Sequence, residues 1–267
     1  KQKVIEAIDE LGYKPNEVAR TLVTKRSHLI GVIVTDIGNS YVAEMVRGIE
    51  EIGKMYKYDI LLCSSHGDLG EEQRFIQLLK RKQVEGIILI SEIVNDDIVC
   101  ILDELQIPFV YLNRYFYIDD FPTVAIDNYE ASYEMTNYLI KLGHKKIAYV
   151  TVDEGEFSLE EYKIAGYKKA MEEVGVEPGF LCYANGYSIE DGYNIGKDFL
   201  ELKDKSKITA VFCSHDEHSI GLMNYFYDNN IRVPEDISVA GFGDIKIASI
   251  YRPRLTTIKE PHYDIGA

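Results

Sequence analysis

Short apolar segments alternate along the chain with longer segments in which apolar positions recur every three or four residues. The short segments predict β-strands at residues 29–34, 59–63, 86–90, 109–112, 123–126, 147–152, 210–213, 237–241 and 255–258. The periodic segments predict α-helices at residues 41–56, 71–81, 95–105, 129–142, 159–174, 189–200 and 218–229. Such regular alternation is typical of parallel sheets covered by helices.

Comparable sets of strands and helices lie on either side of Asp127 and Asn128. We therefore predict an α/β fold with two doubly wound parallel-sheet subdomains, residues 29–128 and 129–258, and a ligand cleft between them. Residues 259–267 would begin a return crossover toward the first subdomain. Ligands of open α/β sheets bind beyond the carboxyl ends of the strands, so the loops at those ends are the places to search for a site.

The composition is that of an acidic globular chain with a slightly basic start. The 267 residues are 46% hydrophobic and carry a formal net charge of −15, which makes a poor surface for nucleic acid. Residues 1–28, however, contain six lysines and arginines against four acidic residues. This asymmetry fits an acidic body attached to a DNA-binding region, although a generic acidic protein with a basic terminus has the same pattern.

The cysteines and the apolar runs indicate the cellular compartment. The cysteines form no Cys-x-x-Cys pair and mostly lie in or beside strand-like runs, which predicts reduced core residues. They are Cys63, Cys100, Cys182 and Cys213. No run reaches the roughly 18 apolar residues of a membrane helix, and Glu6, Asp9 and Glu10 interrupt any secretory segment. We therefore predict a cytoplasmic protein without a membrane partner.

Residues 13–22 are the most informative segment of the chain. Pro15 ends a preceding amphipathic helix, and Asn16 is a favourable N-cap for a new one. That helix would extend only to about Val23, which is too short for stability alone in water. Because Arg20 lies on it and more basic residues follow, a phosphate backbone is a candidate partner.

The sequence Tyr-x-Pro-Asn-x-x-Ala-Arg-x-Leu at residues 13–22, followed by Leu-Ile-Gly-Val-Ile-Val-x-Asp-Ile at residues 29–37, resembles the lactose-repressor/galactose-repressor family of bacterial transcription regulators. The resemblance extends over essentially the whole chain. It implies that residues 15–28 are the hinge helix and linker of such a regulator. It also implies that residues 1–14 are the end of a helix-turn-helix headpiece whose DNA-reading helix lies upstream.

The resemblance further implies how DNA is bound. Family members are homodimers that place two hinge helices side by side in the minor groove of a palindromic operator. Leu22 matches the side chain that wedges between base pairs and kinks the duplex, and Asn16, Ala19 and Arg20 would line the same surface. Effector binding would change the angle between the subdomains and thereby the order of the hinges.

Candidate effector residues in the first subdomain follow its first two strands. Asn39 and Tyr41 lie in the turn after residues 29–34, and Ser64 and His66 follow the second strand. From the residues alone, a turn with an N-cap explains the first pair equally well, and an ordinary polar loop is the commoner explanation of the second pair. The resemblance implies that they contact the effector, and that the first turn also helps to form the dimer.

Asn113 and Arg114 precede three aromatic residues in the loop after residues 109–112. A planar guanidinium group together with stacked rings suits a hydroxylated or phosphorylated ligand. An arginine that lies over surface aromatics is the alternative explanation.

In the second subdomain, the resemblance implies effector contacts at Lys163 and Asp216, with two departures from the family pattern. Lys163 stands where relatives often have an arginine, so the charge is kept and the bidentate fork is lost. Gly243 stands where relatives often have an aspartate, and the acid is shifted to Asp244. These departures predict an altered effector, or one that is bound mainly by other groups.

Several kinds of chemistry have no positive support. No Gly-x-Gly-x-x-Gly follows the first strand and no Walker loop occurs, so no nucleotide cofactor is expected. His215 and His218 flank two carboxylates without an evident third ligand, so no metal site is expected. No serine lies in a Gly-x-Ser-x-Gly elbow, so a sugar-converting enzyme would need residues that meet only in space.

The sequence thus predicts an effector-responsive repressor that binds a small sugar or sugar phosphate and controls DNA binding through its hinge. Residues 43–52 and 55–58 also resemble family members of the catabolite-control type, which respond to a serine-phosphorylated phosphocarrier protein. Arg47, Tyr251 and Arg252 are then candidate contacts. A periplasmic-type solute-binding protein, which shares the two-lobed fold, is the other alternative.

Overall fold

The computed structural model describes residues 26–90, 96–112, 122–153, 159–176 and 180–267. The chain forms two compact units: unit 1 comprises residues 1–112 together with 266–267, and unit 2 comprises residues 113–265. Some of the predicted site residues lie outside the described residues, namely Asn16, Ala19, Arg20, Leu22, Asn113 and Arg114.

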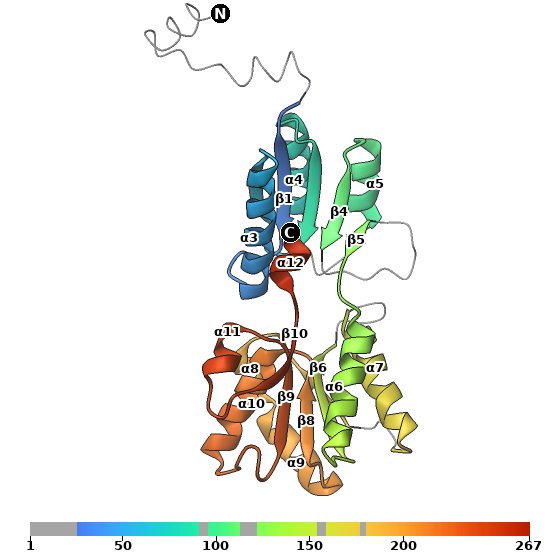
Figure 1. The fold of residues 1–267 in the computed structure, drawn as a ribbon, viewed down its shortest axis with the longest axis vertical. Helices are drawn as coiled ribbons and strands as arrows, with labels where there is room; N and C mark the ends of the chain where they lie inside the picture. Colours follow the sequence, from blue (N-terminus) through green and yellow to red (C-terminus); the bar gives the residue numbers. More distant parts are fainter. Residues whose placement is uncertain (1–25, 91–95, 113–121, 154–158, 177–179) are drawn as a thin grey trace, which may run out of the picture. The chain divides into compact units, whose positions relative to one another are not determined.

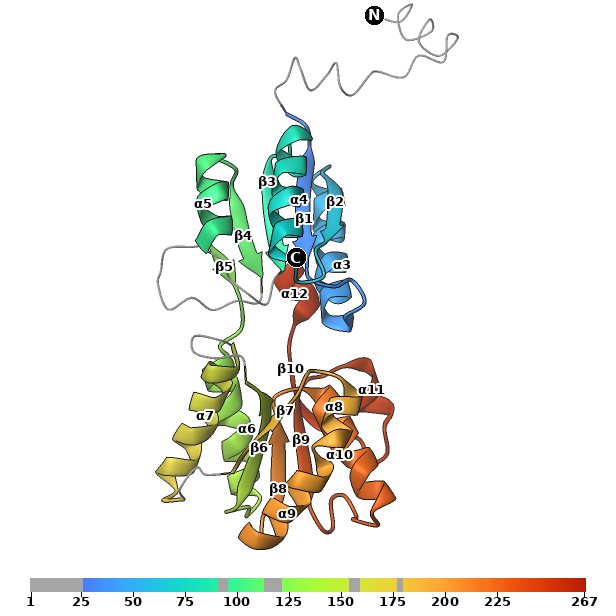
Figure 2. The same ribbon diagram turned by 180° about the vertical axis from the view of Figure 1, so that it is seen from behind.

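Unit 1 is built on a five-stranded sheet with the order β2-β1-β3-β4-β5 (Figures 1 and 2). The strands are β1 (Leu29–Val34), β2 (Asp59–Ser64), β3 (Gly86–Ile90), β4 (Phe109–Leu112) and β5 (Thr123–Val124). Strands β1 to β4 pair in parallel, and the direction of the connections reverses between β1 and β3. This reversal is the topological switch point at which open α/β sheets bind ligands.

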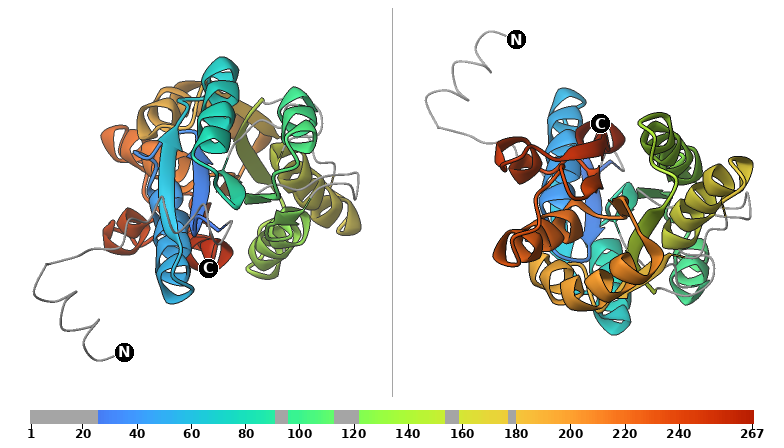
Figure 3. Two further views of the ribbon diagram at one scale, coloured as in Figure 1. Left: turned by 90° about the horizontal axis from the view of Figure 1, so that it is seen from above. Right: turned by 90° about the horizontal axis from the view of Figure 1, so that it is seen from below.

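Helices cover both faces of this sheet. Parallel crossovers are right-handed, and the connection from β1 to β2 runs opposite to those that follow it. Accordingly, α3 (Ser40–Met55) lies on one face, and α4 (Leu69–Arg81) and α5 (Asp96–Glu104) lie on the other (Figure 3). Val32 and Ile33 of β1 point to opposite faces of the sheet and are completely buried, as expected for a central strand covered on both sides.

Unit 2 repeats this architecture with the parallel sheet β10-β9-β8-β6-β7. Its strands are β6 (Ile147–Val152), β7 (Leu181–Ala184), β8 (Ala210–Cys213), β9 (Ser238–Gly243) and β10 (Thr256–Lys259). Its helices are α6 (Asn128–Lys141), α7 (Leu159–Glu173), α8 (Ile189–Asn194), α9 (Gly196–Ser206), α10 (Asp216–Asp228) and α11 (Lys246–Ile250), followed by α12 (His262–Gly266).

Successive strand residues divide the core of unit 2 into two layers, because their side chains point to opposite faces of the sheet. Tyr149 of β6 packs with Tyr167 in the layer under α6 and α7, and the two rings stack at 5.1 Å. Val150, the next residue, packs with Phe199 and Leu222 in the layer under α8, α9 and α10. Figure 3 shows these two helix groups on opposite sides of the strands.

The bounds of β1, β3, β4, β6 and β8 agree with the predicted segments. The sequence did not predict β7, a short strand at the sheet edge whose Tyr183 is half exposed. The single helix predicted at residues 189–200 is wrong, because α8 ends and α9 begins around Ile195. Gly196 lies against Tyr225 there, whose ring would be 2.2 Å from an added Cβ atom. None of the described helices combines the length and apolar character needed to cross a membrane.

Candidate functional site

Polar side chains gather at the carboxyl ends of the strands of unit 2. Thr151 lies near the end of β6, His215 follows β8, and Glu260 follows β10. Glu160 and Lys163 lie at the start of α7, the helix that follows β6. Because parallel strands end at the same edge of a sheet, these five residues come together, and we call them the polar cluster.

An ion pair between Lys163 and Glu160 forms the centre of the polar cluster. The two side chains are 5% and 3% exposed, and Lys163 Nζ lies 3.0 Å from Glu160 Oε1. Lys163 also donates a hydrogen bond of 3.2 Å to the carbonyl oxygen of Ser214 and lies 4.4 Å from the centre of the Phe242 ring. The Thr151 hydroxyl donates to the second carboxylate oxygen, Glu160 Oε2. The charge of Lys163 is therefore already balanced within unit 2.

Electrostatic attraction keeps Glu160 ionised. Burial acts to raise the pKa of this carboxyl group, but attraction to Lys163 and His215, with hydrogen bonds from Ser214 and Thr151, lowers the pKa to about 2. Burial, aided by the charge of Lys163, lowers the pKa of His215 to about 3. His215 Nε2 lies 4.0 Å from Glu160 Oε1, and this contact is not an ion pair at neutral pH because the imidazole is uncharged.

Three rings form a wall beside the polar cluster. Tyr187 meets His215 edge-on at 4.9 Å and stacks with His218 at 6.3 Å. His218 is completely buried, and burial lowers its pKa. Its Nε2 lies 2.7 Å from the carbonyl oxygen of Gly186, whereas its Nδ1 has no hydrogen-bond partner among the described residues. The described part of the chain contains no group of three His, Cys, Asp or Glu side chains arranged to hold a metal ion.

The side chain of Asp216 accepts hydrogen bonds from two other segments of unit 2. It is completely buried at the start of α10. Oδ1 accepts a 2.6 Å hydrogen bond from the Thr257 hydroxyl, and Oδ2 accepts a 2.9 Å bond from the backbone N–H of Ile245. Burial raises the pKa of Asp216 to about 6, against the effect of these bonds. The predicted effector residue thus has internal partners that join α10 to β10 and to the turn after β9.

Two acidic side chains, Asp244 and Glu260, lie near Gly243. Asp244 is exposed and has a left-handed backbone with φ 54°. Glu260 instead approaches from the end of β10, so that a Cβ atom placed at Gly243 would lie 3.9 Å from Glu260 Oε2 and 3.8 Å from Asp216 Oδ2. His262 Nε2 lies 3.3 Å from Glu260 Oε2. Glu260 thus places a second carboxylate near position 243, where the resemblance implies an aspartate.

The candidate residues of unit 1 lie at the carboxyl ends of β1 and β2. Asn39 is the N-cap residue of α3, with no capping hydrogen bond from its side chain, and Tyr41 is half-buried in the first turn. The Ser64 hydroxyl donates a 3.2 Å bond to the carbonyl oxygen of Thr35, and the backbone N–H of His66 donates a 2.7 Å bond to the same oxygen. The structure thus brings Ser64 and His66 together at one edge of the unit 1 sheet.

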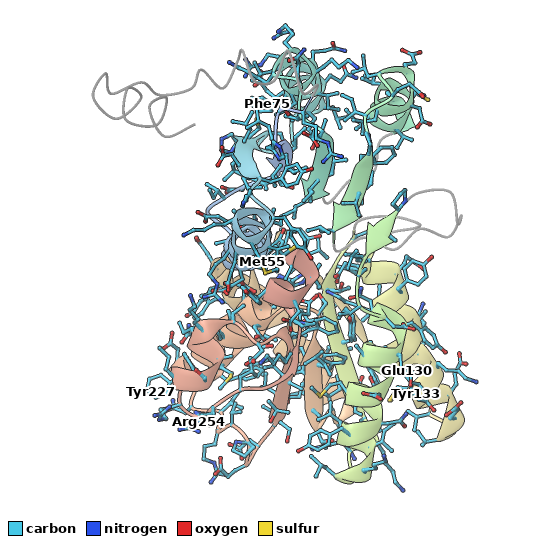
Figure 4. All side chains as sticks on the ribbon, turned by 45° about the horizontal axis from the view of Figure 1, so that its top comes forward. Met55, Phe75, Glu130, Tyr133, Tyr227 and Arg254 are labelled. Carbon is cyan, nitrogen blue, oxygen red and sulfur yellow. The ribbon has the colours of Figure 1, made fainter. Side chains whose placement is uncertain are left out.

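Two of the three candidate protein contacts are exposed, whereas Tyr251 is half-buried and its hydroxyl donates to Asn224. Arg47 pairs with Glu44 at 2.8 Å, and its side chain is 62% exposed. In unit 2, Arg252 is exposed and donates from Nη1 to the carbonyl oxygens of Ile250 and Tyr251. Figure 4 labels Tyr227 and Arg254, two further exposed residues on the surface of unit 2.

Sequence analysis missed Glu160 and Glu260. Glu160 precedes Lys163 by three residues, which is the spacing of neighbours on a helix face, so a search for pairs around Lys163 would have found it. Glu260 directly follows the last predicted strand, at the end where ligands bind. Its approach to Gly243 depends on the pairing of β10 with β9, which the sequence does not specify.

Comparisons with known proteins agree with this architecture. The family model described as "Periplasmic binding proteins and sugar binding domain of LacI family" matches residues 27–267. The HTH-type transcriptional regulator RegA of Clostridium saccharobutylicum is 39% identical over 268 residues, an alignment that covers 100% of this chain and 80% of RegA.

Solved structures show the same likeness. The crystal structure of the transcription regulator CcpA of Lactococcus lactis has a TM-score of 0.81 and 30% identity, and the match covers 90% of this chain and 87% of that one. A LacI family transcriptional regulator from Enterococcus faecium with bound ribose has a TM-score of 0.78 and 28% identity, over 89% and 86% of the two chains. The chain therefore belongs to the LacI, or lactose-repressor, family of transcriptional regulators.

Proposed function

We propose that this chain is the effector-binding core of a transcriptional repressor whose ligand is a small sugar. The observation that carries the proposal is the polar cluster, which combines a carboxylate and a hydroxyl with the neighbouring rings of Tyr187 and Phe242. Pockets that orient a ligand with a few polar groups among aromatic walls suit sugars. Similarity to RegA over the whole chain favours a regulator over a periplasmic-type solute-binding protein or an enzyme.

The proposal extends to DNA binding. Residues 15–28 would form a hinge helix and linker, in which Leu22 wedges between base pairs and Asn16, Ala19 and Arg20 face the minor groove. A homodimer would present two such hinges to a palindromic operator in the cytoplasm. A sugar that binds one arrangement of the protein more tightly than the other would shift the population that binds DNA.

A thermal-shift titration with sugars and sugar phosphates tests the effector role. A ligand at a hundredfold excess over its Kd raises the free energy of unfolding by about 2.7 kcal/mol, which gives a measurable rise in Tm. We expect Lys163→Met to abolish that rise, because the cation holds Glu160 and Ser214 in place. Lys145→Met, at an exposed loop position, is the control and should retain it. A Tm that no sugar changes would contradict the proposal.

A surface of unit 2 favours a second candidate, a catabolite-control-type regulator that responds to a serine-phosphorylated phosphocarrier protein. Ile250 is 70% exposed, and the exposed Arg252 and Arg254 follow it. Guanidinium groups bind phosphate oxygens through paired hydrogen bonds, and an adjacent apolar side chain suits a protein surface. Tyr251 would extend this contact within unit 2, and Arg47 of unit 1 is a separate candidate contact.

Binding to the phosphorylated and unphosphorylated carrier protein distinguishes this candidate from the first. We expect Arg252→Ala to weaken binding of the phosphorylated form about tenfold or more, since charge-assisted bidentate contacts are strong. Arg232→Ala removes another exposed arginine, which pairs with Asp236, and should not change the affinity. Equal affinity for the two carrier forms would contradict this candidate, and the sugar-responsive repressor would remain.

A further inference from the structure

The polar cluster is a poor place for a phosphate group. Its lysine, Lys163, is within 3.0 Å of a buried carboxylate and is not directed at an open position as a free cation. Lys163 is also the lysine whose charge acts most strongly on both Glu160 and Glu260. Lys163 is therefore shared between two carboxylates, of which Glu260 also has His262 as a partner. The neighbouring His215 is uncharged at neutral pH because burial lowers its pKa to about 3.

The surroundings of Gly243 bear on the departure from the family pattern at that position, where relatives often have an aspartate. An aspartate at this position would project a carboxylate toward Asp216 Oδ2 and Glu260 Oε2, which lie 3.8 Å and 3.9 Å from the position of a Cβ atom. Three carboxylates at such distances repel one another strongly. Glycine at position 243 leaves the space to Glu260, which His262 orients through its 3.3 Å contact.

We infer that Glu260 is a specificity-determining residue of this site, which supplies from β10 the carboxylate absent at position 243 and thereby selects uncharged or amino-bearing sugars over phosphorylated ones. The inference rests on the proposed function, because it concerns the same site. A carboxylate accepts hydrogen bonds from hydroxyl and ammonium groups, whereas it repels the negative charge of a phosphate. On this inference, a sugar phosphate would bind less tightly than the corresponding unphosphorylated sugar.

Matched sets of ligands test the inference directly. The probes are glucose, glucosamine and glucose 6-phosphate, with the corresponding sets for galactose and for mannose, titrated calorimetrically into the 267-residue chain. The informative quantity is the ratio of Kd values within a set, which does not require the natural effector. We expect the unphosphorylated or amino sugar of at least one set to bind about tenfold or more tightly than its phosphate, the size expected for like charges at short range.

Two variants assign the selectivity to Glu260. Glu260→Gln keeps the shape and removes the charge, so it should reduce the ratio of phosphate to sugar Kd about tenfold. Asp244→Asn removes an equal charge from an exposed position of the same unit and should leave the ratio unchanged. Glu260→Asp keeps the charge and withdraws it by one methylene, and it replaces Glu260→Gln if that variant fails to fold.

The outcomes separate the inference from the proposed function. A sugar that binds, with a ratio that Glu260→Gln does not alter, overturns the inference and leaves the effector role standing. If the sugar phosphate binds more tightly than its sugar in every set in which binding is seen, the inference is likewise overturned and the effector role still stands. Binding of no sugar in any set overturns the proposed function and the inference with it.

Discussion

The two units place a hydroxyl group and a glutamate at the same point of the fold. In unit 1, Ser65 follows β2, and its hydroxyl donates a 3.3 Å hydrogen bond to Glu72 near the start of α4. In unit 2, Thr151 near the end of β6 donates to Glu160 at the start of α7. A lysine of the same helix, Lys163, then pairs with that carboxylate. The common origin of the pattern is the parallel strand followed by a helix, whose first turn favours an acidic side chain.

The difference lies in what surrounds this pattern. The edge of unit 2 is a buried network of charged groups with partners in α7, β8 and β10. The candidate residues of unit 1 are half-buried or exposed, and Ser64 and His66 bond to a backbone carbonyl oxygen. The polar side chains of unit 2 are therefore held in place by one another, whereas the candidate residues of unit 1 are more exposed.

The largest expected effect is the loss of a buried charge partner. Glu160→Gln leaves the ammonium group of Lys163 buried without its counter-ion, which should lower the free energy of unfolding by about 3–5 kcal/mol. Glu71→Gln in α4 breaks an exposed pair with Arg74 and should leave the stability nearly unchanged. Urea denaturation followed by circular dichroism measures both. Similar midpoints for the two variants would show that the buried pair contributes no more than a surface pair.

A smaller loss of stability is expected when a carboxylate is added at the carboxyl ends of the unit 2 strands. Gly243→Asp forces an aspartate to adopt φ 129°, a strain of about 1–3 kcal/mol, and adds a charge beside Asp216 and Glu260. Gly143→Asp is the matched control, because its φ is 101° and nothing lies within 4 Å of an added Cβ atom. Thermal unfolding should show the larger decrease in Tm for Gly243→Asp. Equal decreases would mean that the strain alone matters and that the edge tolerates a further carboxylate.

Acid should destabilise unit 2 through His215. Its pKa in the folded protein is about 3, below the ordinary value of 6.5, so its contribution to stability is complete above pH 6.5 and is lost as the pH falls toward 3. Asp216 acts in the opposite sense: its pKa is raised to about 6 from 3.8, so its contribution is complete below pH 3.8 and is lost as the pH rises through 6.

His215→Gln separates these two effects. The variant should lose less stability than the parent protein when the pH is lowered from 6.5 toward 4, as measured by urea denaturation at each pH. His66→Gln, an exposed position in unit 1, should follow the parent. A pH dependence that is the same in all three proteins would show that His215 does not remain uncharged in the folded state.

The sequence was sufficient for the fold but not for the geometry of the site. Continuous apolar runs such as Leu29–Val34 must be buried on both faces, so the pattern alone identifies a parallel α/β sheet. Strand β7 lies at an edge, where Tyr183 remains half exposed and the apolar signal is weak. Lys163 and Asp216 follow from resemblance, whereas the approach of Glu260 to Gly243 arises from the pairing of β9 with β10, a long-range contact that no local pattern encodes.

The smallest expected effect concerns the unit 1 edge, where two adjacent serines differ in exposure. The Ser64 hydroxyl makes one half-buried hydrogen bond to the backbone, so Ser64→Ala should cost about 1 kcal/mol of stability or less. If Ser64 contacts the effector, as the resemblance implies, the same change should also weaken sugar binding about fivefold.

Ser65 is the matched control for that change. Its hydroxyl is buried and lies 3.3 Å from two acceptors, the carbonyl oxygen of Val34 and Glu72 Oε1, so Ser65→Ala should lower stability without altering sugar affinity. Calorimetric titration of both variants with the same sugar makes the comparison. If Ser65→Ala weakens binding as much as Ser64→Ala does, then both changes act on sugar affinity indirectly through the structure of unit 1. The direct ligand contact assigned to Ser64 is then wrong. If Ser64→Ala alone weakens binding, the half-buried hydroxyl reaches the ligand, and the unit 1 edge supplies a contact that the buried network of unit 2 does not.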